Sequence, residues 1–353
     1  MSPKALSRQL NNSETAELEN IGLGCFYAHL GGDIMDPLYR AAVKGRVERK
    51  FAGKQDLQSK ARPKQSMSAE REYKRLAREV DMAVIEAVKE ALPKLKRICD
   101  RRYEDTHRYD AQSDDVADIQ RVFAKALAKV SSARFDVTLQ KRLRQLADLN
   151  RKLTVKEWKR VVKKTLGIDI FTDYYNGGNY QRLVDDWVRE NAALVKSVPS
   201  AALDEMQQIV MDGWYNSRST KYIMRDLQKQ FGVSKNKAKF LAVDQSAKLN
   251  AALTQYQQRD AGCIEYVWSS SGDSRVRDRH RELDGKIFRW DNPPVVDTRT
   301  GRRCHPGEDY RCRCVAIPKF DIESLNIPVE PKDWEAIDKQ TKEILEQAYS
   351  RKK

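Results

Sequence analysis

The chain has 353 residues, enough for two or three domains, with a charged fraction of 33% and a mean hydropathy of -0.73. It holds no run of about 18 apolar residues and its N-terminus has no apolar signal core, so we expect neither a membrane span nor secretion. In the cytoplasm, the compartment that this leaves, we do not expect the six cysteines to form a disulfide framework.

The formal net charge of +15 lies almost wholly in residues 1–250, because the rest of the chain carries 19 Lys and Arg against 18 Asp and Glu. A basic surface favours phosphate backbones or acidic protein partners. The alternative is that the charge serves solubility alone and binds nothing specific.

The first part of the chain, residues 1–67, is polar, basic and broken by glycine and proline, which predicts a loosely structured arm with one short helix at most. Cys25 and His29 stand four apart, a spacing that could bind a metal on a helix. The glycines around them favour ordinary apolar anchoring instead.

Helical periodicity begins at Ser68 and continues through residues 68–198. Pro93 is expected to kink or end the first helix, and Thr154 with Glu157 to open a later one as a capping box. Two apolar faces are predicted to be buried, one of Leu76, Val80, Val84, Ile85 and Val88 and one of Val116, Ile119, Val122, Phe123 and Leu127.

Basic residues alternate with the apolar positions between residues 141 and 164. Solvated helix faces explain most of them, and a nucleic-acid face is the alternative. The candidates for that contact are Lys141, Arg142, Arg144, Lys159, Arg160, Lys163 and Lys164.

Further helices are predicted over residues 180–196, from Pro199-Ser200 onward, and up to Gly262, with Gly232 ending one helix and Ser234 capping the next. The pattern then changes. "CIEYVWSSS", "GKIFRW" and "CVAIP" read as three short strands separated by loops rich in Asp, Arg, Gly and Pro. They predict a small module over residues 262–320, followed by a helical tail over residues 321–353.

The expected fold class is therefore α+β, with a mainly helical N-terminal two-thirds followed by a small cysteine-containing α+β C-terminal module. The expected divisions are a basic arm (1–67), a helical region (68–198), a domain of helices and the small module (199–320), and the tail (321–353).

Three stretches of the module follow one another in a distinctive order: a strand ending in "EYVW", then "DSRVRDRHRELDGKIF", then "PGEDYRCRC". With the helices before them, from about Pro199 to Pro318, they resemble the phage head morphogenesis family, the Mu-F-like minor head proteins. The positions that carry the resemblance are Trp268, Asp273, Arg277, Leu283, Asp284, Gly285, Pro306, Gly307 and Arg313.

This resemblance implies a minor structural protein of the phage head without catalytic activity. It implies a place in the virion head, assembly in the host cytoplasm, and a role in head assembly or DNA packaging. The implied partners are the portal protein, the major capsid protein and double-stranded DNA, with no membrane. A nonspecific DNA-binding protein is the alternative.

The cysteines are concentrated in "RCHPGEDYRCRC", and a structural zinc would hold so small a module together. The candidate ligands are His280, Cys304 or His305, Cys312 and Cys314. Two alternatives remain open: ordinary packing, with His280 holding the "LDG" turn by hydrogen bonds, and a disulfide in the mature particle.

Catalysis has weaker support. Cys304 is adjacent to a histidine, and Asp273, Asp278 and His280 could be drawn as a metal nuclease site. Neither set has a spacing typical of such enzymes, so we expect no enzyme.

Overall fold

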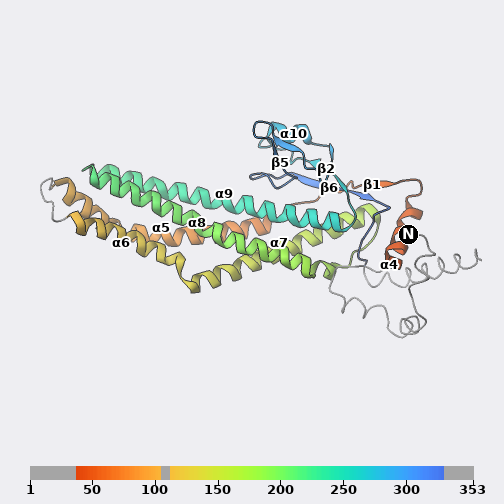
Figure 1. The fold of residues 1–353 in the computed structure, drawn as a ribbon, viewed down its shortest axis with the longest axis horizontal. Helices are drawn as coiled ribbons and strands as arrows, with labels where there is room; N and C mark the ends of the chain where they lie inside the picture. Colours follow the sequence, from red (N-terminus) through yellow and green to blue (C-terminus); the bar gives the residue numbers. More distant parts are fainter. Residues whose placement is uncertain (1–36, 105–111, 330–353) are drawn as a thin grey trace, which may run out of the picture.

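The structure, a computed structural model, describes residues 37–104 and 112–329. Figure 1 shows an elongated helical bundle with a small strand module lying against one of its long helices. The predicted α+β fold class is thereby confirmed. The Cys25 and His29 pair and the tail helix beyond residue 329 lie outside the described residues.

Long antiparallel helices make up the bundle, and the strongest packing is between α5 and α9 and between α8 and α9. Two shorter helices, α6 and α7, run back along it and meet at Ser132, whose hydroxyl caps α7 by accepting a hydrogen bond from the Phe135 amide at 3.1 Å. The bounds are α5 (Met67–Glu104), α6 (Gln112–Ser131), α7 (Ala133–Leu166), the 3₁₀ turn η2 (Thr172–Asn176), α8 (Gly178–Tyr215) and α9 (Thr220–Asp260).

The apolar faces predicted for the first two helices are largely confirmed. All five residues of the α5 face are buried, as are Ile119, Val122 and Phe123 of α6. Leu127 was wrongly included, because its side chain is 39% exposed and Ala126 and Val130 occupy the buried positions of that turn.

The helix ends expected at the two prolines are absent. Pro93 lies inside α5 and Pro199 inside α8, so the boundary placed at residues 198 and 199 falls within one continuous helix. A proline in a helix interior costs about 3 kcal/mol. In helices this long, buried residues on both sides of each proline offset that cost through tertiary packing.

The helix starts expected at Ser234 and Thr154 are also wrong. Ser234 lies within α9, where its hydroxyl donates to Asp81 Oδ1 of α5 in the bundle interior, and α9 runs through Gly232 without a break. Thr154 lies within α7 and its hydroxyl donates to the Asn150 carbonyl at 2.8 Å. Both side chains satisfy their hydrogen bonds inside a helix, so neither is free to cap one.

The described part of the expected arm is more regular than predicted. It holds α4 (Pro37–Lys50), with Val43 and Val47 buried, and β1 (Asp56–Gln58), which pairs with the last strand of the sheet. The Lys50 ammonium also donates to the Leu166 carbonyl at the end of α7, at 3.0 Å. These residues therefore join the bundle to the sheet.

The three predicted strands are present and form one antiparallel sheet with β1, in the order β1-β6-β2-β3. A separate two-stranded ribbon and a short helix complete the module; β1 and the ribbon were not predicted. The bounds are β2 (Glu265–Ser269), α10 (Asp278–Leu283), β3 (Ile287–Arg289), β4 (Val295–Asp297), β5 (Arg302–Arg303) and β6 (Val315–Asp321).

The module has its own small core, separate from the long core of the bundle. Its buried members are Tyr266, Trp268, Leu283, Trp290, Val296, Cys312, Cys314 and Ala316. The two parts meet along α9, where the Gln258 side-chain amide donates to the Ala316 carbonyl at 2.8 Å. None of the helices within residues 37–104 and 112–329 has the length and apolar character that crossing a bilayer requires.

Candidate metal centre

The "LDG" turn places His280 under the sheet. Asp284 Oδ1 accepts a hydrogen bond from the Ser270 amide at 2.7 Å, and the Gly285 amide donates to the Trp268 carbonyl at 2.8 Å. Gly285 has φ of 75°, a backbone conformation that favours glycine. The turn thus holds α10 against β2, and the buried His280 ring lies edge-on to Trp268 with centroids 5.3 Å apart.

The "DYRCRC" loop turns both of its cysteines inward. The Cys312 amide donates to the Asp309 carbonyl at 2.9 Å, and Arg311 adopts φ of 50°. A contact with the bundle stabilises this strained conformation, because the buried carboxylate of Asp244 in α9 accepts a hydrogen bond from the Arg311 amide at 2.8 Å. The loop is therefore fixed on the long helix as well as on the sheet.

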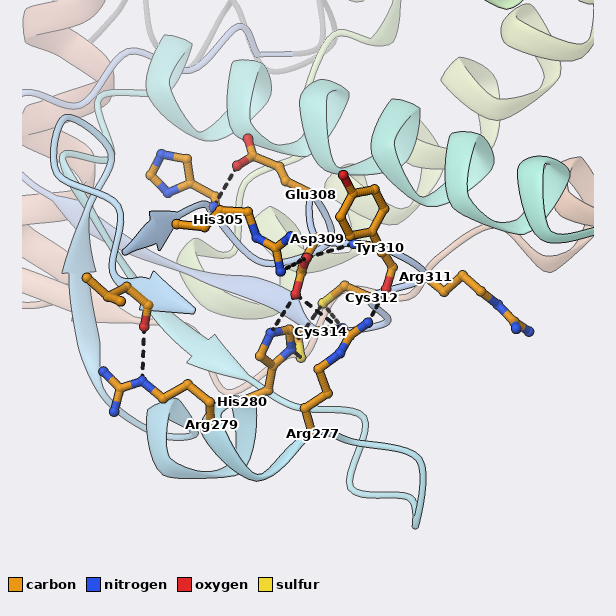
Figure 2. A network of polar contacts seen from close by, with 12 residues as sticks. Arg277, Arg279, His280, His305, Glu308, Asp309, Tyr310, Arg311, Cys312 and Cys314 are labelled. Carbon is orange, nitrogen blue, oxygen red and sulfur yellow. Dashed lines mark hydrogen bonds and ion pairs between the residues drawn. The ribbon is translucent and has the colours of Figure 1, made fainter. Parts of the chain in front are cut away.

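Three potential metal ligands converge inside the module (Figure 2). Cys312 Sγ and Cys314 Sγ each lie 3.6 Å from His280 Nδ1, and all three side chains are buried. Among the described residues, this is the one group of His, Cys and acidic side chains whose ligand atoms come close enough to hold a metal ion.

Asp309 lies on the other side of the His280 ring, and its side chain is only 1% exposed. Its carboxylate is 3.2 Å from His280 Nε2, 3.2 Å from Arg277 Nη1 and 2.9 Å from Arg302 Nη2, and it also accepts the Tyr310 amide at 2.9 Å. Figure 2 shows these groups gathered around the one carboxylate. Asp309 is thus the centre of the polar network of the module.

The surroundings of this network favour charged side chains. Burial by itself would raise the pKa of Asp309, but His280, the Tyr310 amide, Arg277 and Arg302 outweigh it and hold the pKa below its usual value. Burial likewise works to lower the pKa of His280, yet its contacts with Asp309 and Cys312 raise that pKa to about 9. The module therefore stabilises an imidazolium beside a carboxylate.

The two cysteines of the cluster differ sharply. The contact with the Cys314 thiol, with help from His280, lowers the pKa of Cys312 to about 5, against the effect of burial. The same contact and burial raise the pKa of Cys314 well above its usual value. One thiolate is therefore stabilised beside His280, and a thiolate is the form in which cysteine binds metals.

Two of the predicted ligands lie outside the cluster. His305 Nδ1 is hydrogen-bonded to the Tyr266 hydroxyl at 2.9 Å, and its ring packs against Trp290 with centroids 4.9 Å apart. Cys304 is partly buried beside the small core, and burial raises its pKa to about 12. All five cysteines in the described residues, Cys304 among them, are outside any disulfide bond.

The geometry of the three remaining groups fits zinc. With bonds of about 2.3 Å to sulfur and about 2.1 Å to nitrogen, a tetrahedral zinc holds a sulfur and a nitrogen about 3.6 Å apart. That is the separation of His280 Nδ1 from each cysteine sulfur. A zinc-binding histidine usually presents its other nitrogen to a carboxylate, the place that Asp309 occupies.

The positions that carry the family resemblance all have structural roles in the module. Trp268 and Leu283 lie in its core, and Asp284 and Gly285 form the turn above. Arg277 binds Asp309, while Arg313 pairs with Asp273 across the loop. Gly307, at φ of 92°, brings the loop so close to α9 that an added Cβ would lie 2.8 Å from Ala251 Cβ; Pro306 before it is buried.

The nuclease set is not brought together. The Asp278 side chain is 92% exposed and pairs with Arg281, while His280 is buried. Asp273 pairs with Arg275 and Arg313, which lowers its pKa below the usual value despite the opposing effect of desolvation. Both carboxylates therefore pair with nearby arginines, Asp278 within α10 and Asp273 in the loops.

The candidate nucleic-acid residues all lie on α7, and four of the seven form ion pairs with nearby carboxylates. Arg142 pairs with Glu79 at 2.7 Å and Lys163 with Asp169 at 3.0 Å. Arg144 pairs with Asp185 and Arg160 with Glu157. Lys141 and Lys164 are exposed. Much of the charge on this face is therefore compensated within the chain.

The sequence analysis gave no role to Asp244 or Asp309, the two carboxylates that position the cysteine loop. The sequence contains one usable signal, since Asp309 lies three residues before the first cysteine of "CRC". Nothing in the sequence around Asp244 distinguishes it from the other acidic residues of a long helix.

Comparison with known proteins supports the resemblance. Residues 204–317 match the family described as phage Mu protein F like protein, a segment that contains the end of α8, all of α9 and the module as far as the start of β6. An uncharacterized protein of Haemophilus influenzae strain Rd is 39% identical over 160 residues, which are 45% of this chain and 34% of that protein. The matched part thus spans about a third of that relative's length. No solved structure matches the chain.

Proposed function

Because residues 204–317 match the phage Mu protein F like family, we propose that this chain is a minor head protein of a tailed phage or prophage. It acts in head assembly or DNA packaging through contacts with the portal protein, the major capsid protein or DNA. It works in the virion head as a structural component, without catalysis, and is assembled into it in the host cytoplasm. Residues 199–320 form the family domain in this proposal, and its helices, the end of α8 and all of α9, are part of the bundle.

The family match is the observation that carries the proposal. It is supported by the way in which the matching positions build one compact module, from the turn at Asp284 to the loop at Gly307. Their roles are structural: each one packs, turns the chain or pairs with a partner inside the module. A module stabilised in this way suits a protein whose task is to be incorporated.

Co-expression tests the proposal. The tagged chain would be produced together with the capsid and portal proteins encoded beside it, and procapsids would be isolated by sedimentation. We expect the chain to sediment with them, and a variant lacking residues 262–320 to be left out. A full-length chain that stays in the soluble fraction while procapsids form would overturn the assignment.

Nonspecific DNA binding is the second candidate, and the excess of positive charge in residues 1–250 favours it. Binding of that kind weakens steeply between low and physiological salt, because it depends on counterion release. DNA retention measured across a salt series, on chain that enters no procapsid, would support it. The ion pairs on α7 leave little of that face available for phosphate.

A structural zinc ion is the cofactor we propose for the module. His280 Nδ1, Cys312 Sγ and Cys314 Sγ would bind it, and Asp309 would orient His280. When bound, zinc supplies a rigid cross-link between α10 and the cysteine loop. So small a core gains much from such a link.

Native mass spectrometry tests the zinc. We expect one zinc per chain in the wild type and in Cys304→Ser, and none in Cys312→Ser. Cobalt substitution is the second measurement, because thiolate-to-cobalt absorption reports the sulfur ligands even where a variant is unstable. Wild-type protein free of metal after purification with added zinc, or loss of zinc in Cys304→Ser alone, would rule out this ligand set.

A further inference from the structure

The end of the bundle farthest from α4 is where α5 and α8 end and α9 begins (Figure 1), and the sequence of these helix ends is rich in Lys and Arg. We call it the distal tip and define it as residues 92–103 of α5 together with residues 214–229, where α8 ends and α9 begins. These two segments hold nine Lys and Arg and only two carboxylates, Asp100 and Asp226. No other function described above uses this end of the molecule.

Ion pairing compensates only part of this charge. Asp226 is shared by Arg218 at 2.7 Å, Lys229 at 3.1 Å and Arg225 at 3.4 Å, which lowers its pKa to about 2. Two carboxylates of α6 also help, since Asp118 pairs with Lys94 and Asp115 with Arg101. Four cations, Lys96, Arg97, Arg102 and Lys221, have no carboxylate partner among the residues that the structure describes. Arg102 is half-buried over the Trp214 ring, whereas the other three are exposed.

An open groove of about 730 Å³ crosses the tip between α5 and the start of α9. Leu92, Pro93 and Met224 give it an apolar floor. Its charged lining has three cations against a single carboxylate, and the whole polar lining consists of Lys96, Asp100, Tyr103, Ser219, Thr220, Lys221, Arg225 and Gln228.

Three exposed tyrosines lie on the two segments that form the tip. Tyr103 on α5 is 54% exposed and lines it, and Tyr222 on α9 is 47% exposed, with the Arg225 guanidinium stacked 4.8 Å from its ring centroid. Tyr215, at the end of α8, is 56% exposed. Tyrosine, methionine and arginine together are typical of the centre of a protein interface.

We propose that the distal tip docks an acidic segment of a partner protein, one whose apolar side chains enter the groove while its carboxylates meet Lys96, Lys221 and Arg225. Charge complementarity selects an acidic partner. The apolar floor selects a protein segment over nucleic acid, because a phosphate backbone has nothing to bury there. Asp100 inside the groove would also repel phosphates.

Fluorescence anisotropy on the full chain tests this docking. The probe is a fluorescein-labelled peptide with Glu on one helical face and Leu on the other, and its scrambled sequence is the peptide control. We expect the double variant Lys96→Glu/Lys221→Glu to weaken binding by about tenfold or more. The matched control is Lys141→Glu/Lys164→Glu, which makes the same charge change on α7 and should leave binding within about twofold.

A second variant separates the contribution of the apolar groove residues to peptide binding from that of the charges. Met224→Gln keeps every charge, and we expect it to weaken the Glu/Leu peptide by about threefold while leaving the scrambled peptide unchanged. Circular dichroism would confirm that each variant is folded. The groove would bind such a segment whether or not the chain enters procapsids, so this test and the procapsid test fail separately.

Three results would overturn the proposal. One is equal weakening of peptide binding by the tip and α7 double variants, which would mean general attraction to a basic protein. Another is equal binding of the ordered and scrambled peptides, which would exclude a role for the apolar floor. The third is labelled duplex DNA displacing the peptide from the tip at physiological salt, which would make the tip a nucleic-acid site.

Discussion

The helical bundle and the strand module are stabilised in different ways. The bundle has helices of up to 41 residues that bury one continuous apolar core, and few of its buried side chains are charged. The module buries a core of eight side chains, two of which are Cys312 and Cys314, and places the buried Asp309 and His280 beside it. The bundle depends on buried area, whereas the module depends on a few polar contacts at one point.

Two buried aspartates show the difference in detail. In the bundle, burial raises the pKa of Asp81 and only the Ser234 hydroxyl opposes the effect, so its negative charge is unfavourable there. In the module, a histidine and two arginines hold the pKa of Asp309 below its usual value, so its charge is favourable. The charge of a buried aspartate is thus unfavourable in the bundle, whereas in the module it is stabilised and holds the polar network together.

The largest effect is expected from Asp309→Asn, which keeps the size of the side chain and removes its charge. The buried His280 and two arginines would then lack their counter-charge, and we expect the module to lose about 3 kcal/mol of unfolding free energy. Hydrogen exchange would show this as faster exchange of β2 and β6 amides, with α5 and α8 unchanged.

The matched control is Asp278→Asn on the same short helix, whose carboxylate is 92% exposed. It should change the exchange of β2 by little, as exposed ion pairs usually do. Unchanged exchange in Asp309→Asn would mean that the network of arginines and histidine does not hold the module. The expectation concerns the change in exchange that each variant causes relative to the wild type. A slower exchange of α5 amides than of β2 amides within one protein would not contradict it.

An intermediate effect is expected where the module rests on the bundle. Gly307→Ala would place a Cβ 2.8 Å from Ala251 Cβ at a residue with φ of 92°, and we expect a loss of about 2 kcal/mol. Thermal unfolding of the full chain would measure it.

Adding Ala251→Gly to that variant separates the two causes. Glycine inside α9 costs about 0.5–1 kcal/mol by itself, so the Ala251→Gly single variant is the reference for the double variant. Against that reference the steric contact disappears while the backbone strain remains, so Gly307→Ala should cost about half as much as in the wild type. An equal cost of Gly307→Ala in both backgrounds would mean that the close approach of this loop to α9 contributes nothing.

Helix faces and strands could be predicted because local periodicity determines them. The α5 face from Leu76 to Val88 follows a spacing of three and four residues, and "EYVW" is rich in the aromatic and β-branched residues typical of a strand. Helix ends could not be predicted in the same way, because Pro93, Pro199 and Gly232 are local signals that long-range packing overrides. The α9 residue Ser234 shows the cause: its partner, Asp81, lies 153 residues away in the sequence.

The candidate metal site was predicted in part. His280, Cys312 and Cys314 were proposed together, since "LDG" and "CRC" imply turns that bring their neighbours inward. Cys304 and His305 were included because they are near in sequence, yet the loop turns His305 toward Tyr266 and Trp290. Which side of a loop a residue faces depends on tertiary contacts such as the one from Asp244, and the sequence does not display them.

The smallest effect is expected from Asp81→Asn, and it has the opposite sign to Asp309→Asn. The pKa of Asp81 is raised in the folded chain, so its contribution to stability is present below the unfolded pKa and is lost as pH rises through the folded pKa. At neutral pH the wild type therefore carries a cost that asparagine lacks, while the asparagine oxygen can still accept from Ser234. We expect a gain of about 1 kcal/mol at pH 7.

That gain should shrink as the pH falls through the pKa of Asp81, because the wild-type carboxyl then becomes neutral as well. For Asp309, whose folded pKa is lowered, stability is present above the unfolded pKa and is lost as pH falls through the folded pKa. Acid should thus weaken the module while relieving the bundle, and urea unfolding of wild type and Asp81→Asn at several pH values would show it. A loss of stability in Asp81→Asn at pH 7 would mean that the bundle, like the module, needs its buried charge.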